Sequence, residues 1–343
     1  MLADLGADVV IDLSGPDGKA TFLRLIADAD VFIENMSARV MPNLGLDWPH
    51  LQRVNPRLVM VSMSGYGATG PDRDWVAYGS NIETTSGLTS VTGYHDGTLS
   101  RTTLFYADPI SGQLGAVAVL VALRRVAETG TREWIVLALN EAGALFSAGA
   151  LLGHAVTGVA PGTEGNDDPR FAPHGVYRCA GTDHWVAIAV QEDADWVALC
   201  AVAGFDDLAS DRDLDRLEGR WRRRRELDHR ISAWTSLLGQ YDVARRLQAR
   251  AVAAAPVLAN WQILADPHIH RSGFYQPIEH PDVGVYPTST WPWRFADTPA
   301  VIRRHAPRFA QDNRPFLAEI GCDADEIVAL DALGVTADEP TIP

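Results

Sequence analysis

The sequence predicts an α/β protein whose first part is a parallel β-sheet covered by helices. Over about the first 140 residues, helix-period segments alternate with short apolar runs rich in β-branched residues. Several of these runs contain no polar residue in their centre, which is typical of strands buried on both faces. Near Ala160 the composition changes to a stretch rich in Pro, Gly and Asp, which indicates that a second domain begins there.

The elements of the first domain are expected in a regular order. A helical segment before Gly6 leads to an apolar run at 9–13 (VVIDL), and a helix over 15–30 leads to a second run at 31–35 (VFIEN). Residues 50–57 lead into a run at 58–64 (LVMVSMS). An apolar helix over 112–128 leads into the last run, at 134–140 (WIVLALN). In sheets of this kind, ligands bind beyond the carboxyl ends of the strands.

Three loops follow these strands, and the second is the most informative. It contains Gly65, Tyr66 and Gly67 within the sequence GYGATGP. Its glycines allow positive φ angles and close approach of the backbone to a ligand, but the spacing matches neither a dinucleotide fingerprint nor a P-loop. A long turn explains the same residues, so the local pattern leaves both interpretations open.

The second domain is expected to be a smaller mixture of strands and helices. Residues 175–190 alternate like a hairpin around Gly181, and residues 193–250 are mostly helical in pattern. Strand-like runs follow at 252–259, 273–280 and 283–289, and the stretch 313–334 is helical. The predicted domains are a large domain over 1–160, a small domain over 161–300 and a C-terminal segment over 301–343 that returns to the large domain.

Charge and cysteine content limit the classes of partner. Lys and Arg number 29 against 44 Asp and Glu, a net charge of −15, so nucleic acid and acidic membrane surfaces are not expected as partners. The three cysteines lack CxxC spacing, and the first residues lack the pattern of a signal peptide. A soluble protein of a reducing cytoplasm is therefore expected, with no metal site, because His268 and His270 have no third ligand at a suitable spacing.

A run of five arginines in the second domain could contact phosphate, but a solvated helix face is the simpler interpretation. The run comprises Arg220, Arg222, Arg223, Arg224 and Arg225, with Glu218 and Glu226 at helical spacing.

Asp108 is the residue whose position best suits chemistry. Pro109 fits the first position of the helix that follows, which would make Asp108 its N-cap. A carboxylate at a helix start beside the sheet's ligand edge could equally act as a nucleophile or a base. The local pattern does not choose between the two roles.

Successive blocks of the sequence resemble the class III CoA-transferase family, which includes formyl-CoA and carnitine-CoA transferases and the 2-methylacyl-CoA racemases. The blocks are MLADLGADVV, ADVFIENMSARVMPNLGLDW, NPRLVMVSMSGYGATGP, the 78–93 segment, YADPISGQLGAVAVLVALRRVAETG, DPHIHRSGFYQPIEHPDVG and APRFAQDNRPFL. They occur in the family's order over nearly the whole chain. Because relatives begin with a further strand and loop, the sequence is expected to be an N-terminally shortened member.

The resemblance implies a Rossmann-like CoA-binding domain, a smaller α/β domain and an interlocked homodimer. It also implies that Asp108 attacks an acyl-CoA thioester to give an aspartyl anhydride and then an aspartyl-CoA thioester. The expected activity is that of an acyl-CoA:carboxylate CoA-transferase, with the CoA thioester as substrate, a carboxylic acid as acceptor and no tightly bound cofactor. This role requires an ionised Asp108, and we expect helix N–H groups to lower its pKa.

The resemblance also assigns binding residues. Tyr78 matches a residue that lines the acyl pocket, and Asn35, Met36 and Leu44 match positions around bound CoA. Gly65, Tyr66 and Gly67 are added to the expected CoA-binding residues because their loop follows a strand at the sheet's ligand edge. Racemases of the family pair their aspartate with a histidine, and Tyr78 stands at that position. An acyl-CoA racemase or isomerase and a catalytically silent CoA-binding or dimer-partner subunit remain the alternatives.

Overall fold

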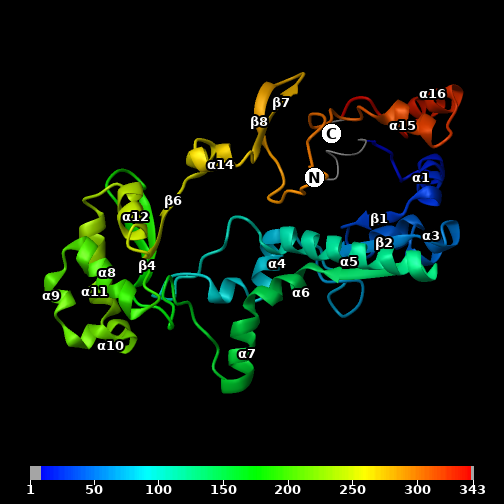
Figure 1. The fold of residues 1–343 in the computed structure, drawn as a ribbon. Coiled ribbons are helices and arrows are strands. Elements are labelled where there is room, and N and C mark those ends of the chain that lie inside the picture. Colours follow the sequence, from blue (N-terminus) through cyan, green and yellow to red (C-terminus); the bar gives the residue numbers. More distant parts are fainter. Residues whose placement is uncertain (1–8, 341–343) are drawn as a thin grey trace. The chain divides into compact units, whose positions relative to one another are not determined.

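The computed structural model describes residues 9–340, which form two compact units (Figure 1). The first unit comprises the chain up to Thr89, Arg101–Ala160 and the chain from Gly273 onward, and the second comprises Ser90–Ser100 and Pro161–Ser272. This division differs from the predicted domains in two places. Residues 273–300 belong to the first unit, and residues 90–100 belong to the second.

The first unit contains the expected parallel sheet. Its strands are β1 (Val31–Glu34), β2 (Val59–Ser64) and β3 (Glu133–Ala138), in the order β1-β2-β3, and both pairs are parallel. Only the central strand β2 is buried on both faces. Ile33 of β1 and Trp134 of β3 are 44% and 42% exposed, so the prediction of strands buried on both faces is correct for the central strand alone.

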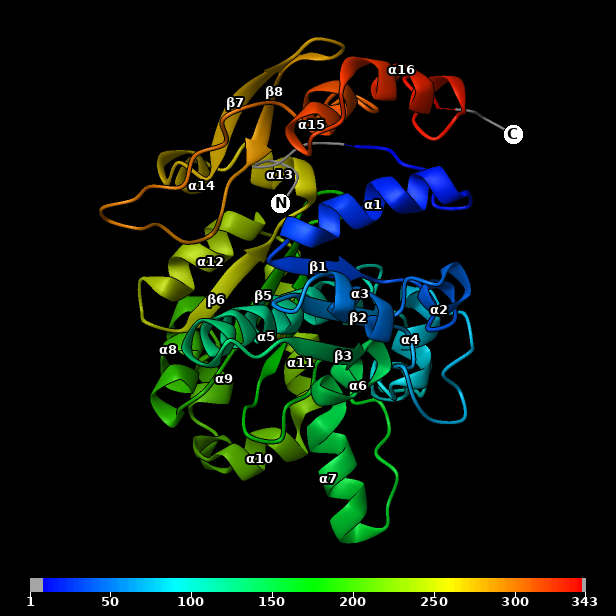
Figure 2. The ribbon, with the colours of Figure 1, turned by 90° about the vertical axis from the view of Figure 1, so that its right-hand side faces the viewer.

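Helices lie on both faces of this sheet. The helix α5 (Ala107–Thr129) lies along the sheet in both views (Figures 1 and 2) and packs Ala122 and Val126 against Val59 and Val61. On the opposite face, Met60 packs with residues of α1 (Pro16–Asp28), α2 (Val40–Leu44) and α3 (Trp48–Val54). The spacing of small and apolar residues along α5 explains its contact with the sheet, because Ser111, Gly115, Ala122 and Val126 share one face.

The rest of the first unit is mainly helical. It contains α4 (Gly79–Thr85), α6 (Leu139–Ala144), a 3₁₀ turn at Leu145–Ser147, α7 (Ala148–Thr157), the hairpin of β7 (Tyr275–His280) and β8 (Gly284–Ser289), α15 (Asn313–Glu319) and α16 (Ala324–Ala332). The predicted C-terminal helical stretch is two helices, because Gly321 adopts a φ of 84° between them. A further 3₁₀ turn at Thr89–Val91 spans the boundary between the units.

One predicted strand is absent. Residues 9–13 form no strand, and the backbone N–H of Asp12 instead donates to the carbonyl oxygen of Val335 at 2.8 Å. Ile11 packs with Leu317 and Ile327 of the C-terminal helices. The apolar run is therefore explained by contact with the chain's end, and the helical segment expected before Gly6 lies outside the described residues.

The second unit contains an antiparallel sheet with helices around it. Its strands are β4 (His174–Arg178), β5 (Trp185–Ala189) and β6 (Ala253–Val257), in that order. The hairpin predicted over 175–190 is thereby confirmed. The helical elements are α8 (Asp193–Ala203), α9 (Asp206–Ala209), a 3₁₀ turn at Arg212–Asp215, α10 (Leu217–Arg222), α11 (Arg224–Thr235), α12 (Gln240–Gln248), α13 (Asn260–Leu264) and α14 (Pro267–Arg271).

The arginine run is not a simple solvated face. Arg220 is 1% exposed, and it donates to the carbonyl oxygens of Ala172 and Leu214 and to the carboxylate of Asp193. The prediction is therefore wrong for Arg220. Three acceptors at fixed positions suit the planar guanidinium group, and helical spacing alone cannot reveal them.

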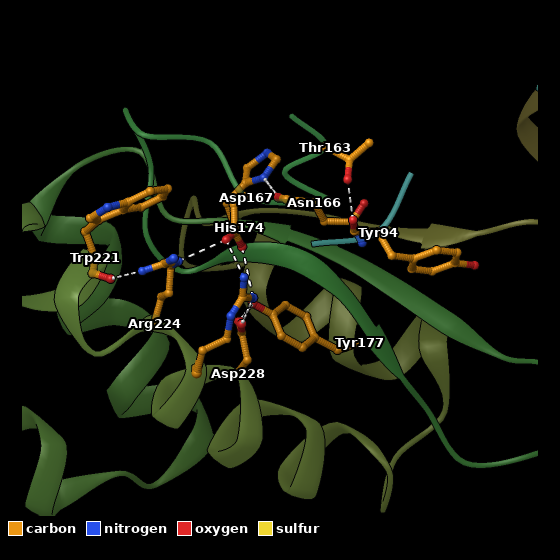
Figure 3. A network of polar contacts seen from close by, with 10 residues as sticks. Tyr94, Thr163, Asn166, Asp167, His174, Tyr177, Trp221, Arg224 and Asp228 are labelled. Atoms are coloured by element: carbon orange, nitrogen blue, oxygen red, sulfur yellow. Dashed lines mark hydrogen bonds and ion pairs between the residues drawn. The ribbon is translucent and has the colours of Figure 1, made fainter. Parts of the chain in front are cut away.

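The arginines at the start of α11 hold the loop that precedes the first strand of the unit. Arg224 pairs with Asp167, whose side chain is 10% exposed, at 2.9 Å (Figure 3). Arg225 pairs with the same carboxylate at 2.6 Å. Tyr177 donates to Asp228 at 2.8 Å in the same network. Burial raises the pKa of Tyr177 well above its usual value, so this hydroxyl remains protonated and donates.

Two properties of the described residues bear on the class of protein. Among residues 9–340, no group of three or more His, Cys, Asp and Glu side chains could hold a metal ion. One described helix, α5, is long and apolar enough to cross a membrane by length and composition. A helix that covers a sheet can have the same length and composition, and the packing of Ala122 and Val126 on β2 accounts for part of this apolar character.

Candidate active site

Asp108 lies in the first turn of α5, on the surface of the first unit. The helix follows β2 in the chain, packs on the sheet and leads into the start of β3. Since β2 and β3 are parallel, the beginning of α5 lies at the carboxyl ends of the strands. The residue that the sequence singled out therefore lies at the sheet edge where ligands of such folds bind.

The predicted N-cap role of Asp108 is wrong. The helix begins at Ala107, after Phe105 with a φ of 45°, so that Asp108 is the second helical residue and its own N–H donates to the Phe105 carbonyl oxygen at 2.9 Å. Among the described residues, no group donates a hydrogen bond to the Asp108 carboxylate. The carboxylate is thus available to a ligand rather than occupied in capping the helix.

Gly79, the first residue of α4, packs against this carboxylate. A Cβ atom at position 79 would lie 2.4 Å from Oδ2 of Asp108 and 2.6 Å from the Cβ of Phe105, both too close for a real contact. Glycine is therefore the residue that lets α4 approach Asp108 so closely. The sequence reasoning missed Gly79, because its neighbours in space are about 30 residues away along the chain.

Partial burial beside Gly79 and Phe105 raises the pKa of Asp108 above its ordinary value. The direction is opposite to the one expected from helix N–H groups, because no N–H group donates to the carboxylate. A carboxylate that has lost water without gaining a donor is a stronger base and nucleophile than a solvated one.

Tyr78 comes next to this pair. It directly precedes Gly79, and its backbone N–H donates to Oδ1 of Asn81 at 3.4 Å. Its side chain is 75% exposed. Tyr78 is therefore linked to Asp108 through Gly79, which follows Tyr78 in the chain and packs against the Asp108 carboxylate at the start of α5.

The loop of Gly65, Tyr66 and Gly67 packs beside the same edge. The carbonyl oxygen of Gly65 accepts from the N–H of Asn140 at 3.1 Å, and a Cβ at position 65 would lie 2.8 Å from the Cβ of Ala77. Gly67 has a φ of 81°, and Tyr66 packs edge-on against Trp75. These glycines are required by contacts within the protein, so the turn interpretation accounts for them.

A cavity of about 500 Å³ lies on the sheet face opposite α5. Met60, Ser62 and Ser64 of β2 form its floor, and Trp48 and Trp134 stack beside it at a centroid distance of 6.3 Å. The remaining lining residues are Glu34, Ala38, Arg39, Met41, Pro42, Asn43, Asp47, Pro49, Ala68, Arg73 and Asp74. The sequence reasoning missed this cavity, although the alternation of two serines with apolar residues in β2 marks a strand face that is not fully packed.

Three predicted CoA-binding residues lie near this cavity without lining it. Asn35 and Met36 are exposed, in the loop between the lining residues Glu34 and Ala38. Leu44 packs against the apolar cluster of α1, α2 and α3. Asp108 does not line the cavity either.

The fold and site define a class: an α/β protein with a parallel sheet and an exposed carboxylate where a helix begins at the sheet's ligand edge. The chain belongs to CoA-transferase family III, whose model matches residues 5–313.

Relatives and solved structures agree with this membership. The chain is 29% identical to a succinate–glutarate CoA-transferase of Agrobacterium fabrum, over 91% of this chain and 78% of the relative. It is 30% identical to the beta subunit of a succinyl-CoA–L-malate CoA-transferase of Chloroflexus aurantiacus, over 93% and 79% of the two chains. The fold is similar to that of a CaiB/BaiF family protein of Brucella suis, with a TM-score of 0.83 and 26% identity over 91% of this chain and 81% of that one. The family resemblance predicted from the sequence is confirmed.

Proposed function

We propose that the protein is an acyl-CoA:carboxylate CoA-transferase and that Asp108 is its nucleophile. The observation that carries this proposal is the Asp108 carboxylate, which is accessible, has no hydrogen-bond donor among the described residues and has a raised pKa. Membership of CoA-transferase family III supports the reaction class. The relatives named above are CoA-transferases as well.

The proposed reaction moves CoA from one carboxylic acid to another through covalent intermediates on the Asp108 carboxylate. An oxygen of Asp108 attacks the thioester carbonyl carbon, and the CoA thiolate leaves to give a mixed anhydride. The thiolate then attacks the Asp108 carbonyl carbon and releases the first carboxylic acid as its anion, which leaves an aspartyl-CoA thioester. The acceptor carboxylate attacks the Asp108 carbonyl carbon of this thioester and expels the CoA thiolate, which gives a second mixed anhydride. The thiolate then attacks the acyl carbon of the acceptor, which forms the new acyl-CoA and restores the Asp108 carboxylate.

The cavity on the other sheet face is the proposed site of the nucleotide end of CoA. Arg39 and Arg73 line it and could approach phosphate oxygens, and the stacked Trp48 and Trp134 offer an aromatic surface for a purine. The pantetheine arm would then cross the carboxyl ends of the strands toward Asp108. Tyr78, beside Asp108, is the proposed contact for the acyl group.

The test traps the covalent intermediate. Purified protein is incubated with a panel of CoA thioesters that includes succinyl-CoA, hydroxylamine is added, and the modified residue is located by mass spectrometry. We expect a hydroxamate on Asp108, and Asp108→Asn should abolish it and lower kcat by about 10³-fold or more. Asp17→Asn is the matched control, because Asp17 also occupies the second position of a helix, and it should leave the activity unchanged.

Other outcomes would contradict the proposal. An adduct on another residue, or transfer by Asp108→Asn within tenfold of the wild-type rate, would exclude Asp108 as the nucleophile. Exchange of the substrate's α-proton in heavy water without any adduct would indicate the racemase alternative. Binding of CoA with neither reaction would indicate a silent subunit.

We further propose that two copies of the chain form a homodimer. Leu114, Val117 and Val121 of α5 recur at three- and four-residue spacing and are at least 39% exposed. None of the residues of α7 is buried, although Leu152 and Val156 are apolar. Contiguous exposed apolar side chains of this kind are typical of protein interfaces.

A further inference from the structure

The helix α4 carries a buried carboxylate that the proposed reaction does not use. Glu83 is 1% exposed. Its Oε1 accepts from the backbone N–H of Thr102 at 3.2 Å and from the Thr102 hydroxyl in a short hydrogen bond. Its Oε2 is buried and has no hydrogen-bond partner among the described residues. A carboxylate with one oxygen unsatisfied is costly to bury, so a stabilising role alone does not explain it.

Thr102 begins the segment that leads to the nucleophile. Asp108 follows six residues later, and residues 103–106 between them are exposed. Phe105, within this segment, has a φ of 45°, a conformation that a non-glycine residue adopts only when its surroundings impose it. The segment therefore needs fixed contacts at its ends.

The helix α4 supplies both of these contacts. Glu83 holds Thr102 at the start of the segment, and Gly79 packs against Phe105 and Asp108 at its end. Positions 79 and 83 are four residues apart, so they lie on the same face of α4, one turn from each other. One helix face thus sets the position of the Asp108 carboxylate at two points.

We infer that Glu83 is a positioning residue of the transferase: by holding Thr102, it fixes the 102–108 segment so that the Asp108 carboxylate lies against Gly79. This inference rests on the proposed function of Asp108. Glu83 does not contact the reacting atoms and acts through Thr102. A small misplacement of a nucleophile slows the chemical step but hardly weakens substrate binding. Loss of this contact should therefore lower kcat rather than raise KM.

The experiment compares four variants with the wild-type protein. Glu83→Leu and Thr102→Val remove the contact from either side, whereas Glu83→Gln keeps an oxygen acceptor and Thr102→Ser keeps the hydroxyl. We expect kcat for CoA transfer and the rate of the Asp108 adduct to fall about 10- to 100-fold in the first two variants, with KM for the thioester within threefold. The two conservative variants should stay within about threefold of the wild type.

A matched control separates positioning from loss of stability. Thr235 is fully buried and its hydroxyl donates to the Arg178 carbonyl oxygen at 2.7 Å, in the second unit. Thr235→Val should lower the unfolding midpoint but leave kcat unchanged. If Thr102→Val keeps kcat within twofold, or if Thr235→Val lowers kcat as much, the inference is overturned. Should Glu83→Leu fail to fold, Thr102→Val decides the question alone.

A second readout does not depend on catalysis. The ionisation of Asp108 can be followed by NMR of ¹³C-labelled aspartate, and loosening of the segment in Thr102→Val should expose the carboxyl and lower its raised pKa. An unchanged Asp108 pKa in a folded Thr102→Val protein would overturn the inference. If the wild-type protein transfers no CoA but the pKa falls as expected, the proposed function fails and the positional role of Glu83 stands.

Discussion

Asp108 combines an exposed position with a carboxylate that is partly shielded by Gly79 and Phe105. The shielding is not compensated by a hydrogen-bond donor among the described residues, and the resulting rise in pKa has a consequence for stability. The folded state disfavours the ionised form, so stability is present below the unfolded pKa and is lost as the pH rises through the folded pKa. The field at the helix start opposes this effect, and the direction of the pKa indicates that burial is larger.

The first prediction follows from the raised pKa of Asp108. Asp108→Asn should be more stable than the wild type at pH 7, and this advantage should disappear as the pH falls below the ordinary aspartate value of 3.8. Urea unfolding midpoints of both proteins at pH 7 and pH 3.5 check it. An Asp108→Asn protein that is less stable than the wild type at pH 7 would mean that the carboxylate has a favourable partner in solution.

The second prediction concerns Gly79. In Gly79→Ala, the new methyl group collides with Oδ2 of Asp108 and with Phe105, so the carboxylate must move. We expect kcat to fall at least tenfold, which is about 1.4 kcal/mol of barrier. Gly15→Ala is the control, because Gly15 precedes α1 with a φ of −96° and nothing lies within 4 Å of its added Cβ. Equal activity of Gly79→Ala and the wild type would show that the close approach has no catalytic role.

At the scale of elements, sequence patterns predicted the helices and strands whose formation depends on residues close together in the chain. The strands at 31–34, 59–64 and 133–138 and the long helix before the last of them have clear periodicity, and the structure contains them. The apolar run at 9–13 has the same pattern but packs against the C-terminal helices instead of pairing in a sheet. A pattern reports that a segment is buried, and only the tertiary structure decides what buries it.

The third prediction compares two arginines of the same helix, α10. Arg220→Met should lower the free energy of unfolding by about 3 kcal/mol or more, because it leaves the buried carbonyl oxygens of Ala172 and Leu214 without donors. Arg222→Met should cost less than about 1 kcal/mol, since the Arg222 side chain is 65% exposed and its partner is Asp213. Hydrogen exchange of the α10 and α11 amides in the full chain measures both. Similar costs for the two variants would contradict the burial of Arg220.

At the scale of the whole molecule, only part of the candidate site could be predicted from the sequence. Asp108 was identified by its place at a helix start and by resemblance, and Tyr78 by resemblance. Gly79, the residue after Tyr78, packs against the Asp108 carboxylate. Gly79 and Glu83 were missed, because their roles arise from contacts with residues 19 to 29 positions away that no local pattern encodes. The stacked tryptophans of the cavity come from a helix and a strand 86 residues apart, and only their packing on β2 reveals them.

The last prediction concerns assembly. The exposed apolar residues of α5 and α7 belong to the same unit, and burying them between two copies would remove their unfavourable contact with water. We expect light scattering after size exclusion to give twice the mass of the 37.3 kDa chain.

Leu152→Glu combined with Val156→Glu places two charges on one face of α7 and should shift the protein toward the monomer, so that a higher concentration is needed for assembly. Leu237→Glu is the matched control, because Leu237 is 79% exposed but belongs to the second unit, and its mass should equal that of the wild type. A wild-type protein that is monomeric at micromolar concentration would contradict the proposal. So would a double variant as tightly assembled as the control, because α7 would then lie outside the interface.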